Sequence, residues 1–423
     1  MRETAPGAVR MMANLLLDTN LRQGTDRAIG AHYSYLCPSP REYKWQRFWD
    51  SCFQAIAIAH IDPEQAKSEL RTLLAAQDDD GFIGHITFWG AKLRGLPHLS
   101  AYGQSRPGER LTHSALIQPP MLAQAVERVA EIAHDPAFAP PLMAALDSYH
   151  NWLAQNRAPD ADGLLVIVSP YESGANQSPT FDEAMGIRGR ASRWRLGFKG
   201  RWLDLRNWLN DYDPTKMLGA DHFHVKDSMV NALYADSLAT MARLHRKQGN
   251  DQSAAAYTRL ASHVTDSMLI KMLDRSDAIF RSLIGREERR SEPLTVLGLV
   301  PLILEGIPRE IAADIAERQL RRHDRFSLRY PAPSVAASEP SFDPRGAGGM
   351  IWRGPTWVNT NWLLWRGLHR HGEAELASQL ADATVAMVAQ AGLREFYNPH
   401  SGQGLGAESF GWSALALDMA ESS

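Results

Sequence analysis

Apolar residues recur every three or four positions along most of the chain, which is the spacing of an amphipathic helix. After Pro120, one such stripe comprises Leu122, Val126, Val129 and Ile132. Proline suits the first turn of a helix, because the N–H that it lacks would be unpaired there. The pattern therefore predicts a helix that begins at Pro120.

The same pattern returns through the rest of the chain. A stripe after Pro141 predicts a second helix, and a third runs from Met229 to Leu244 and stops near Gly249, a residue type that favours helix ends. Alternating strand patterns are scarce, and residues 163–168 are the best candidate for a strand. Further helices are predicted over residues 254–273, 308–320, 358–368, 374–391 and 410–419.

Many helices of ordinary length without alternating strands predict an all-α protein. The chain has 423 residues, too many for one four-helix bundle, and no fixed-period repeat favours a solenoid. No linker rich in Ser, Gly or Pro divides it. We therefore expect a single domain over residues 1–423, a closed toroid of helical hairpins.

Composition and charge narrow the choice of partners. The 45 basic and 48 acidic residues nearly balance, so there is no electrostatic signal for nucleic acid or a membrane surface. No apolar run reaches the ~18 residues of a membrane span. Two cysteines and the lack of a secretory signal pattern favour the cytoplasm. The sequence leaves open whether the chain forms a homo-oligomer.

Four loop segments combine Trp, Gly and polar residues, which is typical of a site at the mouth of a toroid. Indole rings stack on the C–H face of a sugar, and nearby carboxylates, amides and guanidinium groups bind its hydroxyls. For any single tryptophan, core packing is the simpler interpretation, but several such pairs favour a carbohydrate site. The segments cover residues 43–50, 171–179, 349–359 and 395–406.

Hydrolysis of a glycosidic bond needs two carboxyl groups on opposite sides of the anomeric carbon. Glu395, in a loop after a predicted helix, is a candidate for the base that activates water. Asp50, Glu172 and Asp182 are the other carboxylates in or beside the loop segments. Asp50 and Glu172 could equally cap a helix or a turn, and Asp50 directly precedes an apolar helical stretch.

Several of these segments resemble one known family, in the same order. Phe48-Trp49-Asp50-Ser51-Cys52-Phe53 is similar to the opening motif of bacterial glycoside hydrolase family 63, and closest to the glucosylglycerate and mannosylglycerate hydrolases. The resemblance covers roughly residues 30 to 420 and implies an (α/α)6 toroid and an inverting exo-α-glycosidase. No motif in the sequence requires a cofactor or a metal. It continues through Gln118-Pro119-Pro120, Glu172-Ser173-Gly174, Trp352-Arg353-Gly354-Pro355, Asn359-Thr360-Asn361-Trp362 and residues 395–406.

The resemblance also implies roles for individual residues. Glu395 matches the general base, and a small carbohydrate is the expected ligand. Asn176 stands where the family has the aspartic acid that donates a proton, and Gln177 also departs from the family pattern. The residues expected to bind the substrate are Phe48, Trp49, Asp50, Gln118, Glu172, Trp352, Arg353 and Trp357.

An amide cannot donate a proton to a leaving alkoxide as a carboxylic acid does. Three explanations stay open for Asn176: a deliberate change from aspartate, transfer of the acid role to Asp182 or Glu172, or altered chemistry. In the last case the protein binds sugar without turnover, or its substrate has a leaving group that needs no protonation.

A basic stretch with interspersed tryptophans lies between Arg188 and His224, within a candidate cap over residues 165–225. It suits an anionic aglycone such as a carboxylate or phosphate, although such runs are more often solvated faces. His222 and His224 have no obvious third metal ligand, and residues 78–81 resemble a calcium loop in composition only. The stretch contains Arg188, Arg190, Arg193, Arg195, Lys199, Arg201 and Arg206 with Trp194, Trp202 and Trp208.

The alternative from another class is a sugar isomerase or epimerase, since such enzymes also use (α/α)6 folds. They rely on paired histidines for proton transfer, and the histidines here show no recognisable pairing. The dispersed candidates are His60, His85, His113 and His224.

Overall fold

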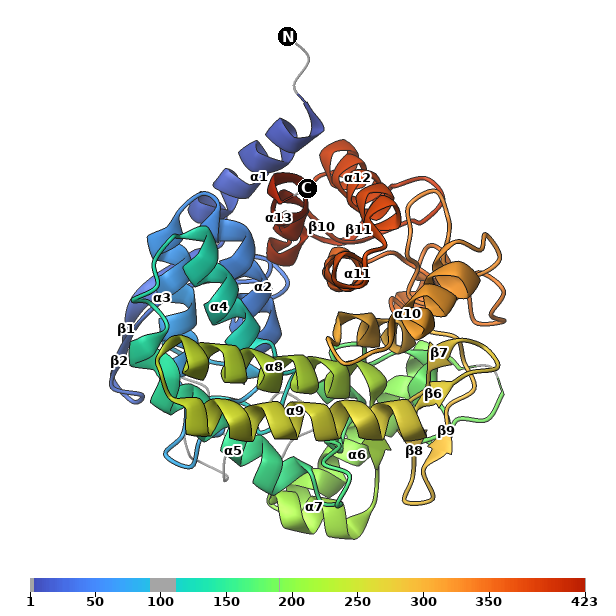
Figure 1. Cartoon of the computed structure of the whole chain (residues 1–423), viewed down its shortest axis with the longest axis horizontal. Coiled ribbons are helices and arrows are strands. Elements are labelled where there is room, and N and C mark those ends of the chain that lie inside the picture. The colour runs from blue at the N-terminus through green and yellow to red at the C-terminus, as the bar shows by residue number, and fades with distance from the viewer. Residues whose placement is uncertain (1–3, 92–111, 190, 423) are drawn as a thin grey trace.

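The computed structural model describes residues 4–91, 112–189 and 191–422. Within these residues, six segments form an inner ring in which each contacts the next and the last returns to the first (Figure 1). The ring is closed, as the toroid prediction requires. In order its members are α2 (Phe48–Ala59), α4 (Leu122–Ile132), α8 (Ser228–Lys247), the 3₁₀ turn Val300–Ile303, α11 (Val358–His371) and α13 (Leu415–Glu421).

An outer layer of helices covers this ring. α3 packs on α2, α9 on α8 and α12 on α11, so consecutive helices form hairpins. This arrangement confirms the all-α (α/α)6 fold. The outer members are α1 (Ala5–Thr19), α3 (Pro63–Leu74), α5 (Met143–Arg157), α9 (Asp251–Lys271), α10 (Arg309–Ile315) and α12 (Ala374–Ala391).

The predicted helices are found within a few residues of their expected ends. α4 begins at Leu122, two residues after Pro120, and α12 spans residues 374–391 as predicted. The strand prediction for residues 163–168 is wrong. Only an isolated bridge between Ile167 and Val225 forms there, because the Leu165 backbone N–H and carbonyl pair with the Asn231 side chain of α8 and not with a strand.

Inner helices are buried over more of their surface than outer ones. All twelve residues of α2 are buried, and one apolar cluster extends through the whole ring. A group of hydrogen bonds also connects the inner helices. The buried Asp418 of α13 accepts hydrogen bonds from His60, Arg128 and Trp362 at 2.7–2.8 Å. These partners belong to, or directly follow, α2, α4 and α11.

The strands are short antiparallel pairs in the connections between helices. The pair β10–β11 is irregular, with a register shift between Arg394 and Phe396. The strands are β1 (Leu21–Asp26), β2 (Ala31–Leu36), β3 (Gln46–Arg47), β4 (Ile86–Thr87), β5 (Val225–Lys226), β6 (Leu273–Asp274), β7 (Ile279–Phe280), β8 (Leu283–Ile284), β9 (Arg289–Arg290), β10 (Arg394–Tyr397) and β11 (Gly404–Glu408).

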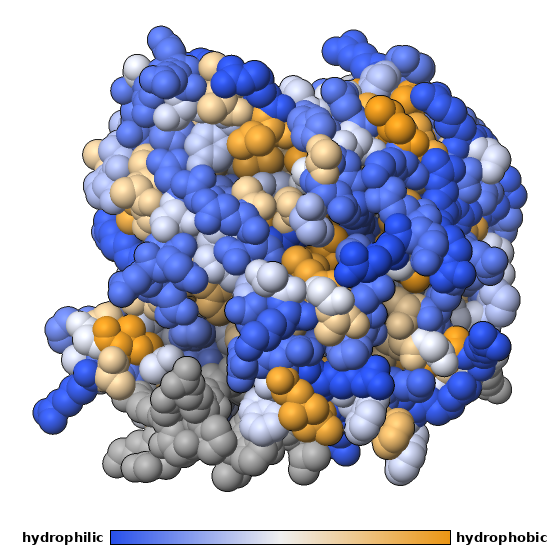
Figure 2. Space-filling view, turned by 90° about the horizontal axis from the view of Figure 1, so that it is seen from below, coloured by the Kyte–Doolittle hydropathy of each residue, from blue (hydrophilic) through white to orange (hydrophobic). Residues whose placement is uncertain are grey.

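Two helices, α6 (Arg193–Leu209) and α7 (Pro214–Ala220), lie outside both layers, at the lower side of Figure 1. A small apolar cluster that includes Leu116, Val168, Tyr212 and Met217 fixes them to the toroid. Figure 2 looks from this side, where hydrophobic residues form separate patches in a mainly hydrophilic surface. The basic stretch lies on α6 from Arg193 onward; Arg188 precedes the helix, and Arg190 lies outside the described residues.

No helix among the described residues combines the length and the apolar character that crossing a membrane would take.

Candidate active site

A cavity of about 170 Å³ opens where the N-terminal ends of the inner helices meet. Its wall comes from the segments that precede α2, α4, α11 and α13, and from the loop between α5 and α8. Loops far apart in the sequence thus form one site, as expected for a toroid. The wall contains Tyr43, Arg47, Trp49, Asp50, His85, Gln118, Tyr171, Gly174, Asn176, Gln177, Ile351, Trp352, Trp357, Glu395, Phe410 and Trp412.

Glu395 is held in this wall by the irregular pairing of β10 with β11. The shift places an extra residue of β11 opposite Glu395, and such bulges commonly redirect a side chain. The Ala407 N–H donates to Oε2 and the Tyr43 hydroxyl donates to Oε1, both at 3.0 Å. One donor on each oxygen fixes the carboxylate before any ligand is bound.

Gly406 makes room for this carboxylate. A Cβ on Gly406 would lie 2.5 Å from Glu395 Oε2, which is closer than real Cβ contacts. The residue also has a φ of +67°, which side chains rarely adopt. Glycine is therefore required at this position for two reasons, the positive φ of the backbone and the space that the Glu395 carboxylate takes.

Both carboxyl groups in the wall are buried, and burial disfavours their charged forms. Burial raises the pKa of Glu395 above its ordinary value, although the Ala407 and Tyr43 hydrogen bonds oppose the shift. It raises the pKa of Asp50 to about 7, against the opposing charge of Arg47. A raised pKa makes Glu395 a stronger base, while its two donors keep the charged form accessible.

Aromatic rings form much of the remaining wall. Trp352 and Trp357 stack with their centroids 4.0 Å apart and their planes 2° apart. Trp49 meets Trp412 edge to face at 5.5 Å. A Cβ on Gly174 would lie 2.4 Å from the Trp49 ring, so this loop can pass the indole only with glycine. The rings present rigid faces suited to the C–H side of a sugar.

Amides complete the wall. The Gln118 Oε1 accepts from the Trp49 N–H at 3.0 Å, which ties the loop before α4 to the first turn of α2. Gln177 Oε1 accepts from the Ile351 N–H at 2.9 Å. Asn176 is half-buried, and its side chain forms no hydrogen bond with the rest of the described chain. Its amide therefore remains available to a ligand.

Comparisons with known proteins agree with this geometry. Residues 43–413 match the family described as the mannosylglycerate hydrolase MGH1-like glycoside hydrolase domain. The chain belongs to this family. It is therefore a glycoside hydrolase, of a family whose relatives act on small glycosides.

The relatives match over nearly their whole length. The mannosylglycerate hydrolase of Thermus thermophilus is 29% identical over 419 residues, which cover 91% of this chain and 96% of that protein. The glucosylglycerate hydrolase of Mycolicibacterium hassiacum is 26% identical, covering 90% and 92%. A crystal structure of the family 63 mannosylglycerate hydrolase from Thermus thermophilus with Tris and D-glycerate has a TM-score of 0.80 at 28% identity, covering 98% of this chain and all of that one.

The structure brings most of the expected subsite residues to the cavity wall. These are Trp49, Asp50, Gln118, Asn176, Trp352, Trp357 and Glu395. Asp50 does not cap α2, because the helix begins two residues earlier, at Phe48, and Asp50 lies in its first turn.

Three other expected residues lie behind the wall, which corrects their placement in the subsite. Phe48 packs in the core against Tyr149, with ring centroids 5.3 Å apart. Glu172 is fully buried and pairs with Arg157 at 2.6 Å. It also accepts from two backbone N–H groups. These contacts use the oxygens that would otherwise reach a ligand.

Arg353 is likewise committed to a partner inside the protein. Its guanidinium forms two bonds with Asp182, at 2.6 and 2.9 Å, and its Nε donates to the Gln177 carbonyl at 2.9 Å. Neither Arg353 nor Asp182 lines the cavity. The pair anchors the loop that carries Asn176 and Gln177, so these residues support the site.

Some wall residues were not predicted as site residues. Phe410 and Trp412 belong to a stretch that reads as a helical stripe, so its periodicity conceals their role. Tyr43 and Arg47 lie within a segment rich in Trp and charge, which was a usable signal. The Arg47 guanidinium lies 4.8 Å from the centre of the Tyr43 ring and so helps to position the tyrosine.

The structure does not bring the four candidate histidines together. His60 pairs with Asp418 and His113 with Asp78, while His224 lies near Asp221. Only His85 is among the wall residues, and burial lowers its pKa to about 3. A single neutral imidazole does not supply the histidine pair of an isomerase, so this alternative loses its chemical basis.

The acidic side chains that could hold a metal ion are paired with other groups of the protein. Asp160, Asp162 and Glu288 come together, but the Lys226 ammonium lies 2.5–2.8 Å from all three. Asp80 lies in a turn after α3, where its carboxylate accepts hydrogen bonds from the Phe82 N–H and from the indole N–H of Trp152 in α5. The residues 78–81 thus act as a turn between elements.

Proposed function

We propose that the protein is an inverting exo-α-glycosidase that acts on a short α-glucoside or α-mannoside, of the glucosylglycerate or mannosylglycerate type or another short glycoside. The observation that carries the proposal is the orientation of Glu395, fixed by two donors in an aromatic cavity of the size of one sugar ring. The names of the relatives support the choice of substrate.

In this proposal the sugar stacks against the tryptophans of the wall. Asp50 and Gln118 bind its hydroxyls, since a carboxylate and an amide offer directional acceptors and donors. Because the wall leaves space for about one ring, the enzyme removes a terminal sugar. Nothing in the reaction calls for a cofactor.

Glu395 acts as the base. It takes a proton from a water molecule, whose oxygen forms a bond with the anomeric carbon on the face opposite the leaving group. Inverting enzymes keep ~6.5–9.5 Å between their two catalytic groups to admit this water. The configuration at the anomeric carbon then changes in the product.

Asn176 stands at the position of the proton donor. The contacts of Glu172 and Asp182 oppose a transfer of the acid role to either, since each is held by an arginine behind the wall. Because Asp50 is assigned to the sugar hydroxyls, the leaving group then departs without a proton from a carboxylic acid. The Asn176 amide can still donate a hydrogen bond to the departing oxygen.

The test compares the chain with Asn176→Asp on glucosylglycerate and mannosylglycerate, whose leaving groups are alkoxides. General acid catalysis is worth about 10²–10⁴-fold, so we expect Asn176→Asp to accelerate release of free sugar by at least ~100-fold. Proton NMR of the first product should show the inverted anomer.

Two results would contradict the proposal. Retention of configuration would exclude Glu395 as a base acting through water. Failure of both proteins to release sugar, with monosaccharide binding intact by calorimetry, would indicate a sugar-binding protein without turnover. Asn176 is the observation that favours this second candidate function, because it removes the proton donor.

A further inference from the structure

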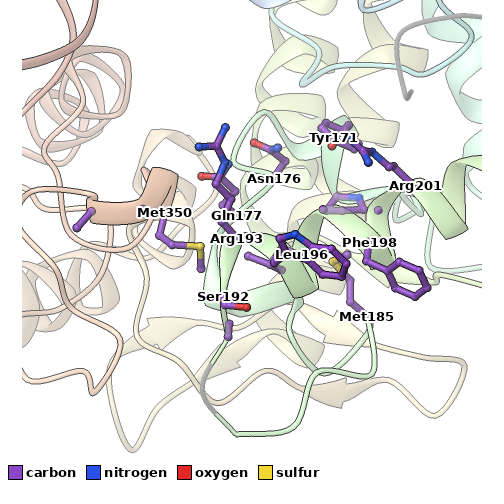
Figure 3. A pocket seen from close by; sticks show the side chains of 17 residues that line it. Tyr171, Asn176, Gln177, Met185, Ser192, Arg193, Leu196, Phe198, Arg201 and Met350 are labelled. Carbon is purple, nitrogen blue, oxygen red and sulfur yellow. The ribbon is translucent and has the colours of Figure 1, made fainter. Parts of the chain in front are cut away.

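A second and larger cavity, of about 1050 Å³, adjoins the catalytic cavity. The two share Tyr171, Asn176 and Gln177 in their walls. In Figure 3 these three lie in the upper part of the view together with Arg193 and Arg201 of α6, while Phe198 lies lower and Met350 to the left. A leaving group attached to a sugar in the inner cavity would pass Asn176 and enter this outer cavity.

The wall of the outer cavity contains no carboxyl group and no imidazole among the described residues. Its charged members are Arg193 and Arg201, and neither forms an ion pair within the described part of the chain. They lie eight residues apart on α6, close to two helical turns, and therefore on the same face. This side of the site offers cations and amides but no acid to protonate a leaving group.

The outer cavity also has an aromatic edge on α6. Trp194 and Phe198 stack with their ring planes 4° apart and their centroids 6.5 Å apart. They are 82% and 60% exposed, which is unusual for such large apolar side chains. Their exposed faces line the same cavity as the two arginines.

Two glycines of α6 also line the outer cavity. Gly200 lies close to Tyr171, since a Cβ there would be 3.7 Å from the ring. At Gly197 a Cβ would meet nothing within 4 Å, so the space beside it is empty. The volume far exceeds what a three-carbon glycerate would fill.

From these features we propose that the outer cavity binds a leaving group with a planar ring that departs as a stable anion, a phenolate or a nucleotide phosphate. The ring stacks on Trp194 and Phe198, and the anion lies near Arg193 and Arg201. The inference rests on the proposed hydrolysis with Glu395 as base, and names the substrate class of that site.

The step balances without a protein acid. The water oxygen forms a bond with the anomeric carbon, and the proton of the water passes to Glu395. The bond between the anomeric carbon and the leaving oxygen breaks, and its electron pair stays on that oxygen. The sugar and the anion are released, and Glu395 then returns its proton to solvent.

The experiment measures kcat/KM on four kinds of substrate, each as glucoside and mannoside. Glycosyl fluorides have a small leaving group that needs no proton, and the glycerate glycosides have a poor one. Dinitrophenyl glycosides and nucleoside diphosphate sugars separate phenolate from phosphate. We expect at least one planar class to exceed the glycerate glycosides by ~100-fold, since each tenfold is 1.36 kcal/mol of barrier.

Gly197→Phe fills the empty space on α6. We expect kcat/KM on the preferred planar substrate to fall at least ~10-fold more than kcat/KM on the fluoride. Gly219→Phe is the matched control, because Gly219 is also helical with nothing within 4 Å, but lines a different cavity. It should leave all rates unchanged.

The outcomes separate the two proposals. Hydrolysis of the fluoride, with the glycerate glycosides preferred over both planar classes, overturns the outer-cavity inference and keeps the proposed function. An equal effect of Gly197→Phe on all substrates also overturns it. Failure to hydrolyse any substrate, fluoride included, overturns both.

Discussion

The inner cavity and the α6 side of the outer cavity differ in the sign and the burial of their charged groups. The inner wall buries two carboxyl groups among tryptophans and fixes Glu395 with two donors. The α6 side exposes two arginines that have no ion pair in the described chain. In the proposed reaction, the site is therefore rigid where the sugar would react and open where the leaving group would depart.

The largest expected effect comes from removing the base. Glu395→Gln keeps the shape of the side chain but cannot take a proton, so kcat on glycosyl fluorides should fall by about 10²–10⁴-fold. Calorimetry should show that monosaccharide affinity changes far less. Glu408→Gln is the control, because Glu408 lies on the neighbouring β11 but is exposed and pairs with Arg394. An equal loss of kcat in both variants would contradict the assignment of Glu395 as the base.

A smaller loss is expected when Glu395 remains but its position changes. Gly406→Ala places a Cβ against Oε2 and should lower kcat by about 10²-fold, the cost of a displacement near 1 Å. Gly372→Ala tests backbone strain alone, since Gly372 also has a positive φ, of +83°, but has nothing within 4 Å. A similar rate loss in both would mean that strain, and not the position of Glu395, explains the result.

Asp50→Asn should separate binding from stability. Loss of a charged acceptor for sugar hydroxyls should raise KM about tenfold, since hydrogen bonds to charged groups contribute roughly 1.5–3 kcal/mol. Enzyme assays with a series of substrate concentrations measure this change.

The same substitution should stabilise the fold at high pH. The pKa of Asp50 rises from 3.8 to about 7 on folding, so its contribution to stability is full below pH 3.8 and declines as pH rises toward 7. An asparagine side chain does not ionise. The free energy of unfolding of Asp50→Asn, relative to that of the original chain, should therefore rise as the pH is raised from about 4 to about 8. Denaturant unfolding at both pH values checks this, and a constant difference would contradict the burial of a charged Asp50.

The smallest effect concerns the exposed arginines. Added salt screens exposed charges, so KM for an anionic planar substrate should rise a few-fold from low to high salt, while KM for a fluoride stays constant. Arg201→Gln should reduce this salt dependence. Lys247→Gln, a change in an exposed cation that pairs with Glu127 on another face, should not.

The fold could be predicted because helices leave a periodic record in the sequence. α8 and α12 carry clear apolar stripes, and both were predicted within a few residues. α6 was not predicted as a helix, because its stripe is interrupted by arginines and glycines and it packs little of its surface. An apolar stripe in the sequence marks a buried helix face, so a helix that stays exposed has only a weak periodic pattern.

The site was predicted in part for a similar reason. Residue types identified Glu395 and the tryptophan-rich loops, but not the direction of each side chain. Arg353 and Glu172 suit a sugar as well as they suit Asp182 and Arg157, and only the three-dimensional arrangement shows which partner each has. Trp412 was hidden inside a helical pattern, although it completes the aromatic wall.

The ring closes through its last member, and this has a consequence for synthesis. α13 carries Asp418, which binds the elements of three other inner helices, and Trp412 lies just before it. While the ribosome is still making the chain, the inner faces of α2 and α11 have no α13 to cover them. We expect nascent chains shorter than about residue 411 to bind chaperones, because exposed apolar surface on partly folded chains promotes aggregation. The sugar cavity then forms late, in the same step that closes the ring.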